Sequence, residues 1–275
     1  MAEPGPLLVK LGGSLITDKR VRESVRPEIL ARLARELVDC REAWSAGGLV
    51  VGHGSGSFGH FAAAGSPLAE SRRAPTAVDR EALRAATART HDAAARLHRH
   101  VVGALLDAGV GPYSLSPSGW LTAAAGEVAS VHLEPIEGAL RLGLVPVVHG
   151  DVVVDLQAGA VIASTELVFE ALCRGLGARG RRPRLAIWLG ETDGILDRSG
   201  ARVERVTAAS LEAVRAATAG SRGVDVTGGM RLRLETAWRL ACAGVPSRIV
   251  DGRIEGSLTR VLGGDCGGTR VEAPG

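Results

Sequence analysis

The chain contains only two lysines, and both lie within its first twenty residues. Of its 33 basic residues, Lys10 and Lys19 are lysines and the others are arginines. Lysine offers a compact ammonium on a flexible stem, which suits a group that follows a moving phosphoryl group, whereas arginine presents a planar fork. One lysine in a chain that otherwise uses arginine can be explained by coincidence, but two lysines within one motif favour a chemical role.

Lys10 opens the first of two glycine-rich segments, each of which follows a short apolar run. The first is KLGGS, residues 10–14, and the second is GHGSGSFGH, residues 52–60. Glycines let backbone N–H groups approach phosphate oxygens, and a following helix adds the positive end of its dipole. The pair therefore indicates two phosphate groups or one shared chain of them. Tight strand-to-helix turns are the alternative.

Neither segment is a strong match to a common nucleotide-binding motif. No G-K-[ST] follows either loop, so a Walker A motif is excluded. Gly54, Gly56 and Gly59 fit G-x-G-x-x-G, but that match alone is a weak indication.

The hydrophobic pattern predicts an α/β fold. Apolar runs predict strands within 7–11, 48–52, 146–164, 184–196 and 247–252, and helical spacing predicts helices within 26–48, 77–108, 165–177, 206–220 and 228–244. Strands rich in Val, Ile and Leu that alternate with helices are typical of a mainly parallel sheet covered on both faces. We expect a three-layer αβα sandwich, formed by one domain over 1–275 with two lobes.

Composition argues against several classes of protein. The net charge of +3 is small, and the basic run at 179–184 is interpreted as a solvated loop. No apolar stretch has the length of a membrane helix, and the N-terminal segment lacks a signal-peptide pattern, so we expect a cytoplasmic protein with no nucleic-acid or membrane partner. The cysteines lack metal-ligand spacing and are expected to be small buried residues: Cys40, Cys173, Cys242 and Cys266.

Five segments resemble the amino acid kinase superfamily in order and separation, and within it most resemble the isopentenyl phosphate kinases. These are VKLGGSLITDK, GHGSGSFGHF, PVVHGDVVVD, ETDGIL and DVTGGM, so that the likeness runs from about Leu7 to beyond Val250. The resemblance implies ATP-dependent phosphorylation of isopentenyl phosphate to its diphosphate, a step in isoprenoid precursor synthesis and the mevalonate pathway. It also implies a homodimer and a requirement for Mg²⁺. The residues that would bind Mg²⁺ cannot be named from their spacing in the sequence.

The resemblance assigns the lysines and the first loop to the transferred group. It implies that Lys10 reaches the phosphoryl group, that Lys19 neutralises charge in the transition state, and that Gly12, Gly13 and Ser14 hold ATP phosphates through backbone N–H groups. These roles suit phosphoryl transfer, which depends on positioning and charge neutralisation.

The second loop is implied to bind the acceptor. By resemblance, His60 donates to the substrate phosphate, and Gly54, Ser55, Gly59 and Thr165 help to bind it, with Ser55 also contacting ATP. A protonated histidine donates from both ring nitrogens. Without the resemblance, a helix-start histidine with no ligand is the favoured interpretation of His60.

The remaining histidines are weaker candidates. His53 and His149 lie near the same predicted sheet edge. His91, His98 and His100 fall on the long predicted helix and are expected to be solvated.

The second half is implied to hold ATP, which makes about 1–163 the acceptor lobe and about 164–275 the nucleotide lobe. The ETDGIL turn would lie near adenine and ribose, and DVTGGM would open a helix along the phosphates. The positions implied to contact ATP are Glu191, Thr192, Asp193, Gly194, Gly228, Gly229 and Arg233. A plain helix cap by Thr227 is the alternative for DVTGGM.

Three departures from the family pattern leave other functions open. Thr165 stands where a glycine is common, Arg233 replaces a lysine, and Glu191-Thr192 replaces Asp-Val. A fosfomycin kinase, which also phosphorylates a small phosphorus oxyanion, is the alternative enzyme. A non-catalytic regulatory domain of this fold is the other alternative, against which the two retained lysines argue.

Overall fold

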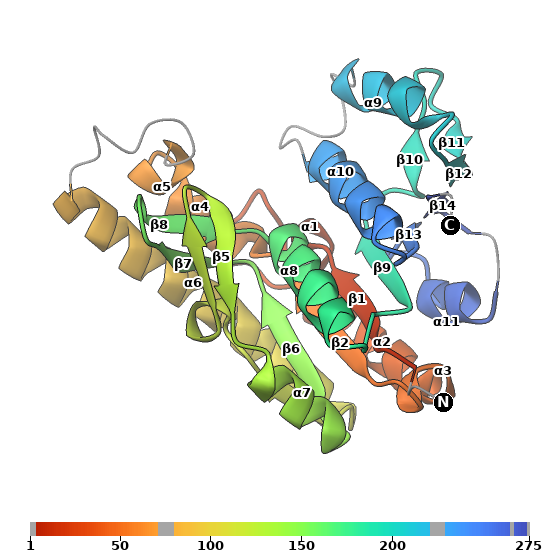
Figure 1. Cartoon of the computed structure of the whole chain (residues 1–275), viewed down its shortest axis with the longest axis horizontal. Coiled ribbons are helices and arrows are strands. Elements are labelled where there is room, and N and C mark those ends of the chain that lie inside the picture. Colours follow the sequence, from red (N-terminus) through yellow and green to blue (C-terminus); the bar gives the residue numbers. More distant parts are fainter. Residues whose placement is uncertain (1–3, 71–79, 221–228, 265–266, 274–275) are drawn as a thin grey trace.

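The computed structural model describes residues 4–70, 80–220, 229–264 and 267–273. Within these ranges, eight strands form the central sheet in the order β12-β14-β13-β9-β1-β2-β6-β3 (Figure 1). Their bounds are β1 (Leu7–Leu11), β2 (Leu49–His53), β3 (Pro112–Ser114), β6 (Val145–His149), β9 (Leu185–Gly190), β12 (Arg205–Val206), β13 (Ser247–Asp251) and β14 (Thr269–Val271). Neighbouring strands of the sheet are parallel except β13 and β14, so β14 and its parallel neighbour β12 run opposite to the other six strands.

Helices cover both faces of this sheet, which confirms the three-layer prediction. Their bounds are α1 (Gly13–Ile16), α2 (Pro27–Asp39), α3 (Arg41–Ser45), α4 (Gly56–Ala63), α5 (Pro67–Glu70), α6 (Arg80–Asp107), α7 (Glu134–Arg141), α8 (Thr165–Ala178), α9 (Leu211–Gly220), α10 (Gly229–Cys242) and α11 (Ser257–Leu262). Successive strand residues point to opposite faces. Leu8 therefore packs with α7, α8 and α10, whereas its neighbours Leu7 and Val9 pack with α2, α6 and α11.

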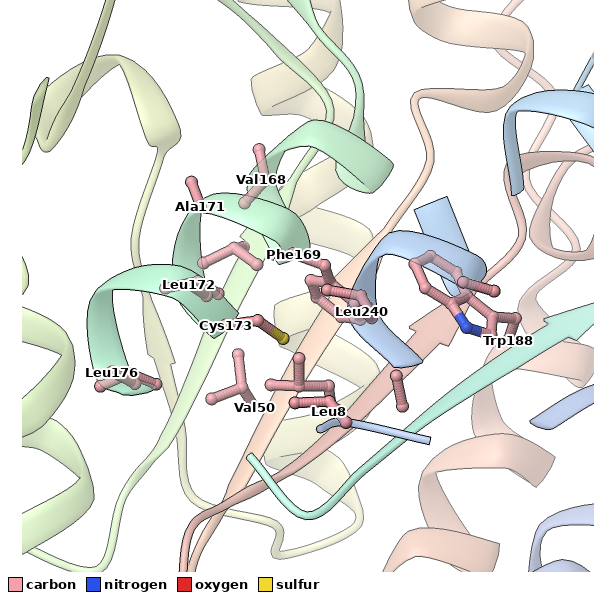
Figure 2. Close-up of a cluster of buried hydrophobic side chains, with 14 of the residues drawn as sticks. Leu8, Val50, Val168, Phe169, Ala171, Leu172, Cys173, Leu176, Trp188 and Leu240 are labelled. Atoms are coloured by element: carbon pink, nitrogen blue, oxygen red, sulfur yellow. The ribbon is translucent and has the colours of Figure 1, made fainter. Parts of the chain in front are cut away.

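The core on the first face joins α8 and α10 to the central strands. Figure 2 shows Phe169 and Cys173 of α8 beside Leu8 of β1 and Trp188 of β9. The rings of Phe169 and Trp188 are both fully buried, with centroids 5.5 Å apart. Removal of a buried aromatic ring of this kind costs about 3–5 kcal/mol. This packing fixes where α8 begins, and α8 contributes to the candidate site.

A second, smaller sheet continues from the central one. It has the order β5-β4-β7-β8, with bounds β4 (Leu121–Ala124), β5 (Glu127–Val131), β7 (Asp151–Asp155) and β8 (Gly159–Ala163). Strand β6 leads through Gly150 into β7, which pairs antiparallel with β8. This arrangement confirms the strand, glycine turn and hairpin predicted within 146–164. A two-stranded ribbon is formed by β10 (Ile195–Leu196) and β11 (Arg202–Val203).

Two sequence predictions on buried and solvated residues have mixed outcomes. Cys40 and Cys173 are buried as predicted, but Cys242 is exposed, and Cys266 lies outside the described residues. Cys242 ends α10, where the side chain has already turned toward solvent. In the basic run, Arg179 is exposed and pairs with Glu134 and Glu137.

Among the described residues, no helix is long and apolar enough to cross a membrane.

Candidate active site

The strand order brings the glycine loops together at one edge of the sheet. Strand β1 lies between β2 and β9 and is parallel to both, so the loops that follow these three strands emerge side by side. Ligands in such sheets bind at the carboxyl ends of the strands. A cavity of about 890 Å³ opens at this edge. The predicted site residues that line it are Lys10, Gly13, Ser14, Lys19, Gly54, Ser55, Gly59, His60, Thr165, Glu191, Thr192, Gly194, Gly229 and Arg233.

Three predicted residues are not among those that line the cavity. Gly12 lies behind the first loop, where its N–H donates to the carbonyl of Leu189 at 2.8 Å. The Asp193 carboxylate pairs with Arg202 at 2.6 Å. Gly228 lies outside the described residues.

The two glycine loops contact each other through their backbones. A Cβ on Gly13 would come within 2.6 Å of the Gly56 nitrogen, and one on Gly54 within 2.9 Å of the Gly13 nitrogen. Gly56 also has a φ of +52°, which favours glycine. The Thr17 hydroxyl joins the loops, because it donates to the Gly13 carbonyl and accepts from the Ser57 N–H. Close backbone approach therefore explains the glycines.

Among the described residues, three helices of eight or more residues begin at this cavity. Its lining includes the first residues of α4 and α10, and the Ser164 cap and first residues of α8. The first turn of a helix leaves backbone N–H groups without partners in the helix, and its dipole is positive at that end. Three such ends aimed at one space make it suitable for a polyanion.

Lys10 lies at the centre of the site as a buried cation. Its Nζ forms an ion pair with the carboxylate of Glu166, the second residue of α8, and both side chains are almost completely buried. Burial lowers the pKa of the Lys10 ammonium from its usual 10.5 to about 8, an effect that Glu166 opposes and Arg233 reinforces. Burial alone would raise the pKa of Glu166, but Lys10 and Arg233 hold it below its usual value. The pair is thus ionised at neutral pH.

Three further cations, Lys19, Arg198 and Arg233, line the cavity from different elements. Arg233 extends from α10 over the end of β9, where a Cβ on Gly190 would come within 2.8 Å of its guanidinium. Its buried Nε has no hydrogen-bond partner among the described residues. Lys19 is exposed, in the loop before α2. The described part of the cavity therefore presents cations from β1, the loop after α1, α10 and, through the exposed Arg198, the turn after β10.

His60 lines the same cavity from α4. It lies one turn into this helix rather than at its start, and its side chain is exposed. From this position a ring nitrogen can donate to a ligand next to the loop of Gly54 and Ser55.

One wall of the cavity is apolar. It includes Ala63 and Ala64 from the end of α4, Ala94 of α6 and Ile162 of β8. These side chains are small or aliphatic, so the wall can bury a short hydrocarbon group beside the histidine.

Each acidic side chain that lines the described part of the cavity has at least one partner, although Asp151 Oδ2 is buried and has none among the described residues. Glu166 pairs with Lys10, Glu191 accepts from Arg26 at 2.9 Å, and Asp151 accepts from His91 at 2.8 Å. Among the described residues, no group of three or more His, Cys, Asp or Glu side chains could hold a metal ion.

Sequence reasoning missed several of these residues and misplaced one. The role of Glu166 as the partner of Lys10 was not predicted. His98, expected to be solvated, is buried and forms a hydrogen bond with His53, because α6 turns this face toward the sheet. His91 is only half exposed and pairs with Asp151, whereas His100 is exposed as predicted.

Comparisons with known proteins agree with this architecture. The model of the Amino acid kinase family matches residues 6–251. An isopentenyl phosphate kinase of Methanothermobacter thermautotrophicus is 32% identical over 96% of this chain and 98% of its own length. One from Haloferax volcanii is 34% identical over the same shares. A solved structure described as isopentenyl phosphate kinase matches with a TM-score of 0.75 and 27% identity, over 96% of this chain and 99% of its own.

The chain therefore belongs to the amino acid kinase family. Within that family it groups with the isopentenyl phosphate kinases, which confirms the resemblance drawn from the motifs.

The buried pair predicts an unusual titration of Lys10. Because the chain has only two lysines, protein labelled with ¹³C at the lysine Cε should show two resonances, one of which titrates with a pKa near 8. Glu166→Gln removes the charge that raises this pKa, so the pKa should fall further. Lys19 is the internal control, since its resonance should not respond to that substitution. Titration of Lys10 near 10.5 would contradict the buried pair.

Proposed function

We propose that this protein transfers the γ-phosphoryl group of ATP to the phosphate of isopentenyl phosphate, giving ADP and isopentenyl diphosphate. The observation that carries the proposal is the joint placement of two glycine loops, three helix N-termini and Lys10 around one cavity. Acceptor and donor are both phosphates, so the reaction needs two phosphate-binding loops that face each other across the transferred group. The names of the relatives support this choice of substrates.

Lys10 would hold the transferred phosphoryl group between the loops. The group is most anionic in the transition state, and charge placed there in advance needs no reorganisation during the reaction. Glu166 keeps the ammonium charged and oriented within its buried site. Lys19, at the rim, would neutralise charge from the other side.

The first lobe, about 1–163, would hold the acceptor. His60 and the backbone of Gly54 and Ser55 would bind its phosphate, and Thr165 would contribute from the start of α8. The isopentenyl tail would lie on the apolar wall next to Ala94 and Ile162.

The second lobe, about 164–275, would hold the nucleotide. The turn from Glu191 to Gly194 would face the adenosine, and Gly229 and Arg233 the phosphates. The departure at Arg233 suits this role, because a guanidinium holds phosphate in two directions at once. Mg²⁺ would arrive with ATP, bound mainly by phosphate oxygens, as its preference for few protein ligands allows. We further propose a homodimer, by analogy with the family.

The direct test is a screen of acceptors with ATP and Mg²⁺. Isopentenyl phosphate should give isopentenyl diphosphate and ADP, detected by ³¹P NMR. Dimethylallyl phosphate, longer prenyl phosphates, fosfomycin, glutamate, acetylglutamate and carbamate serve as the comparison set. Turnover of fosfomycin or an amino acid without turnover of any prenyl phosphate would overturn the assignment, and no turnover at all would favour a regulatory domain.

The two lysines should act mainly on the chemical step. Lys10→Ala and Lys19→Ala are each expected to lower kcat by about 10²-fold or more, as for other preorganised charge stabilisers. Lys19→Arg keeps the charge but changes the donor geometry, so it should not restore the full rate. Steady-state kinetics with both substrates measures this. Full kcat in Lys19→Arg would mean that the lysine is there by coincidence.

His60 should act on acceptor binding. A hydrogen bond to a charged partner contributes about 1.5–3 kcal/mol, so His60→Ala should raise KM for isopentenyl phosphate by roughly tenfold to a hundredfold. KM for ATP should change little, and His60→Gln, which keeps one donor, should retain more activity. Varying each substrate in turn separates these effects. An unchanged acceptor KM in His60→Ala would reduce His60 to a structural residue of α4.

A further inference from the structure

Three histidines stack directly behind the second glycine loop. His53 ends β2, His149 ends β6 and His98 comes from α6, and all three side chains are buried. Their ring centroids lie 5.2 Å apart for His53 and His98, 5.4 Å for His53 and His149, and 4.4 Å for His98 and His149. None of the three is among the residues that line the cavity. Burial of three ionisable rings beside a candidate phosphate site suggests that they serve the site.

The hydrogen bonds determine which nitrogen of each ring carries the proton. His53 Nδ1 lies 3.0 Å from the Gly54 carbonyl, and His149 Nδ1 lies 3.1 Å from the Gly150 carbonyl. A carbonyl can only accept, so both Nδ1 atoms are donors. His53 Nε2 is 2.9 Å from His98 Nδ1. Since a neutral ring has one proton, His53 Nε2 accepts and His98 Nδ1 donates.

Serine hydroxyls complete the set. His98 Nε2 lies 2.7 Å from the Ser114 hydroxyl, and His149 Nε2 lies 3.2 Å from the Ser116 hydroxyl. Both nitrogens lack a proton in the assignment above, so both hydroxyls donate. Every ring nitrogen of the stack therefore has a partner of the correct kind when all three rings are neutral Nδ1–H tautomers.

Addition of a proton would break this pattern. A proton on His53 Nε2 would face the N–H of His98, and a proton on His98 or His149 would face a hydroxyl that must turn away. Burial lowers the pKa of His98 to about 3, with His149 and Arg99 adding to the effect. Burial also holds the pKa of His53 well below its usual value, helped by His98, His149 and Lys10.

The surroundings of His149 shift its pKa in opposite directions. Burial lowers its pKa, while Asp151 and the Gly150 carbonyl act in the other direction and His91 lowers it again. The pKa values of all three rings are thus lowered, which agrees with the neutral rings that the hydrogen bonds require.

The rings hold peptide groups of the candidate phosphate site. In a trans peptide the C=O and the following N–H point in opposite directions. Because His53 holds the Gly54 carbonyl on the side of the stack, the N–H of Ser55 is turned toward the cavity that Ser55 lines. The backbone carbonyl of His53 also accepts from the Gly150 N–H at 3.0 Å and from the Thr165 hydroxyl at 2.6 Å.

We propose that His53, His98 and His149 are positioning residues: a neutral, proton-ordered stack that orients the peptides of Gly54–Ser55 and Gly150 and the start of α8 for the acceptor's phosphate. The link to acceptor phosphate rests on the proposed function. The tautomers of the stack do not rest on the proposed function, so the proposal about the stack and the proposed function can fail separately.

The first test is the protonation state of the rings. In ¹⁵N-histidine-labelled protein, long-range ¹H–¹⁵N spectra distinguish Nδ1–H, Nε2–H and doubly protonated rings. Three of the seven histidines should show the Nδ1–H pattern unchanged from pH 8 to pH 5.5, and single replacement of His98 by Asn should remove one of these signals and assign it. An Nε2–H ring among the three, or titration of any of them in this range, overturns the proposal even if the enzyme turns over isopentenyl phosphate.

The second test separates the hydrogen bond from packing at His98. His98→Asn is smaller than histidine but keeps a donor near the Nδ1 position, whereas His98→Leu fills more of the space and has no donor. If the stack positions the loop, His98→Leu should raise the acceptor KM by about tenfold, with KM for ATP nearly unchanged, and His98→Asn should lie closer to the wild type. If His98 only fills space, Leu should be the better replacement, and that order overturns the proposal. The ring spectra of wild-type protein decide the case should either variant fail to fold.

Discussion

The site depends on one buried ammonium that must stay charged. Lys10 lies in the central strand of the sheet, almost completely out of water, where desolvation disfavours its charged form. Glu166, in the first turn of α8, offsets this cost through its ion pair with Lys10. The packing of Phe169 on Trp188 in turn holds α8 in place. The hydrophobic core and the electrostatics of the cavity are therefore linked, since a displaced α8 would leave the ammonium without its partner.

The order of the strands explains why two loops far apart in the sequence can serve one reaction. With β1 between β2 and β9, the turns after these strands emerge together, and glycines allow the first two to contact through backbone atoms. In the proposed reaction, donor and acceptor phosphates would then share one space around Lys10. The glycine loops and Lys10 are held in place by contacts within the protein, and groups positioned in advance stabilise a transition state efficiently.

The features that sequence could predict are local ones. The strand before Lys10, the glycine loops and the hairpin after Gly150 each appear in a single short window, and so did the motifs that identified the family. The contacts that sequence reasoning missed join distant segments. Glu166 is 156 residues from Lys10, and His98 is 45 residues from His53, so no spacing rule relates them. His98 was misjudged because the alanine-rich α6 shows little contrast between its buried and exposed faces. Short strands such as β3 and β14 were missed because three residues carry too weak a pattern.

The central claim is that donor and acceptor phosphates meet directly in this one cavity, with charge neutralisation and without a covalent intermediate. The exposed His60 is the side chain that could otherwise carry a phosphoryl group between two half-reactions. The stereochemical course at phosphorus decides between these cases. With ATP made chiral at the γ-phosphorus by oxygen isotopes, the isopentenyl diphosphate formed should show inversion, because a single in-line displacement inverts the centre. Retention of configuration would require two displacements through a phosphorylated enzyme and would contradict the claim.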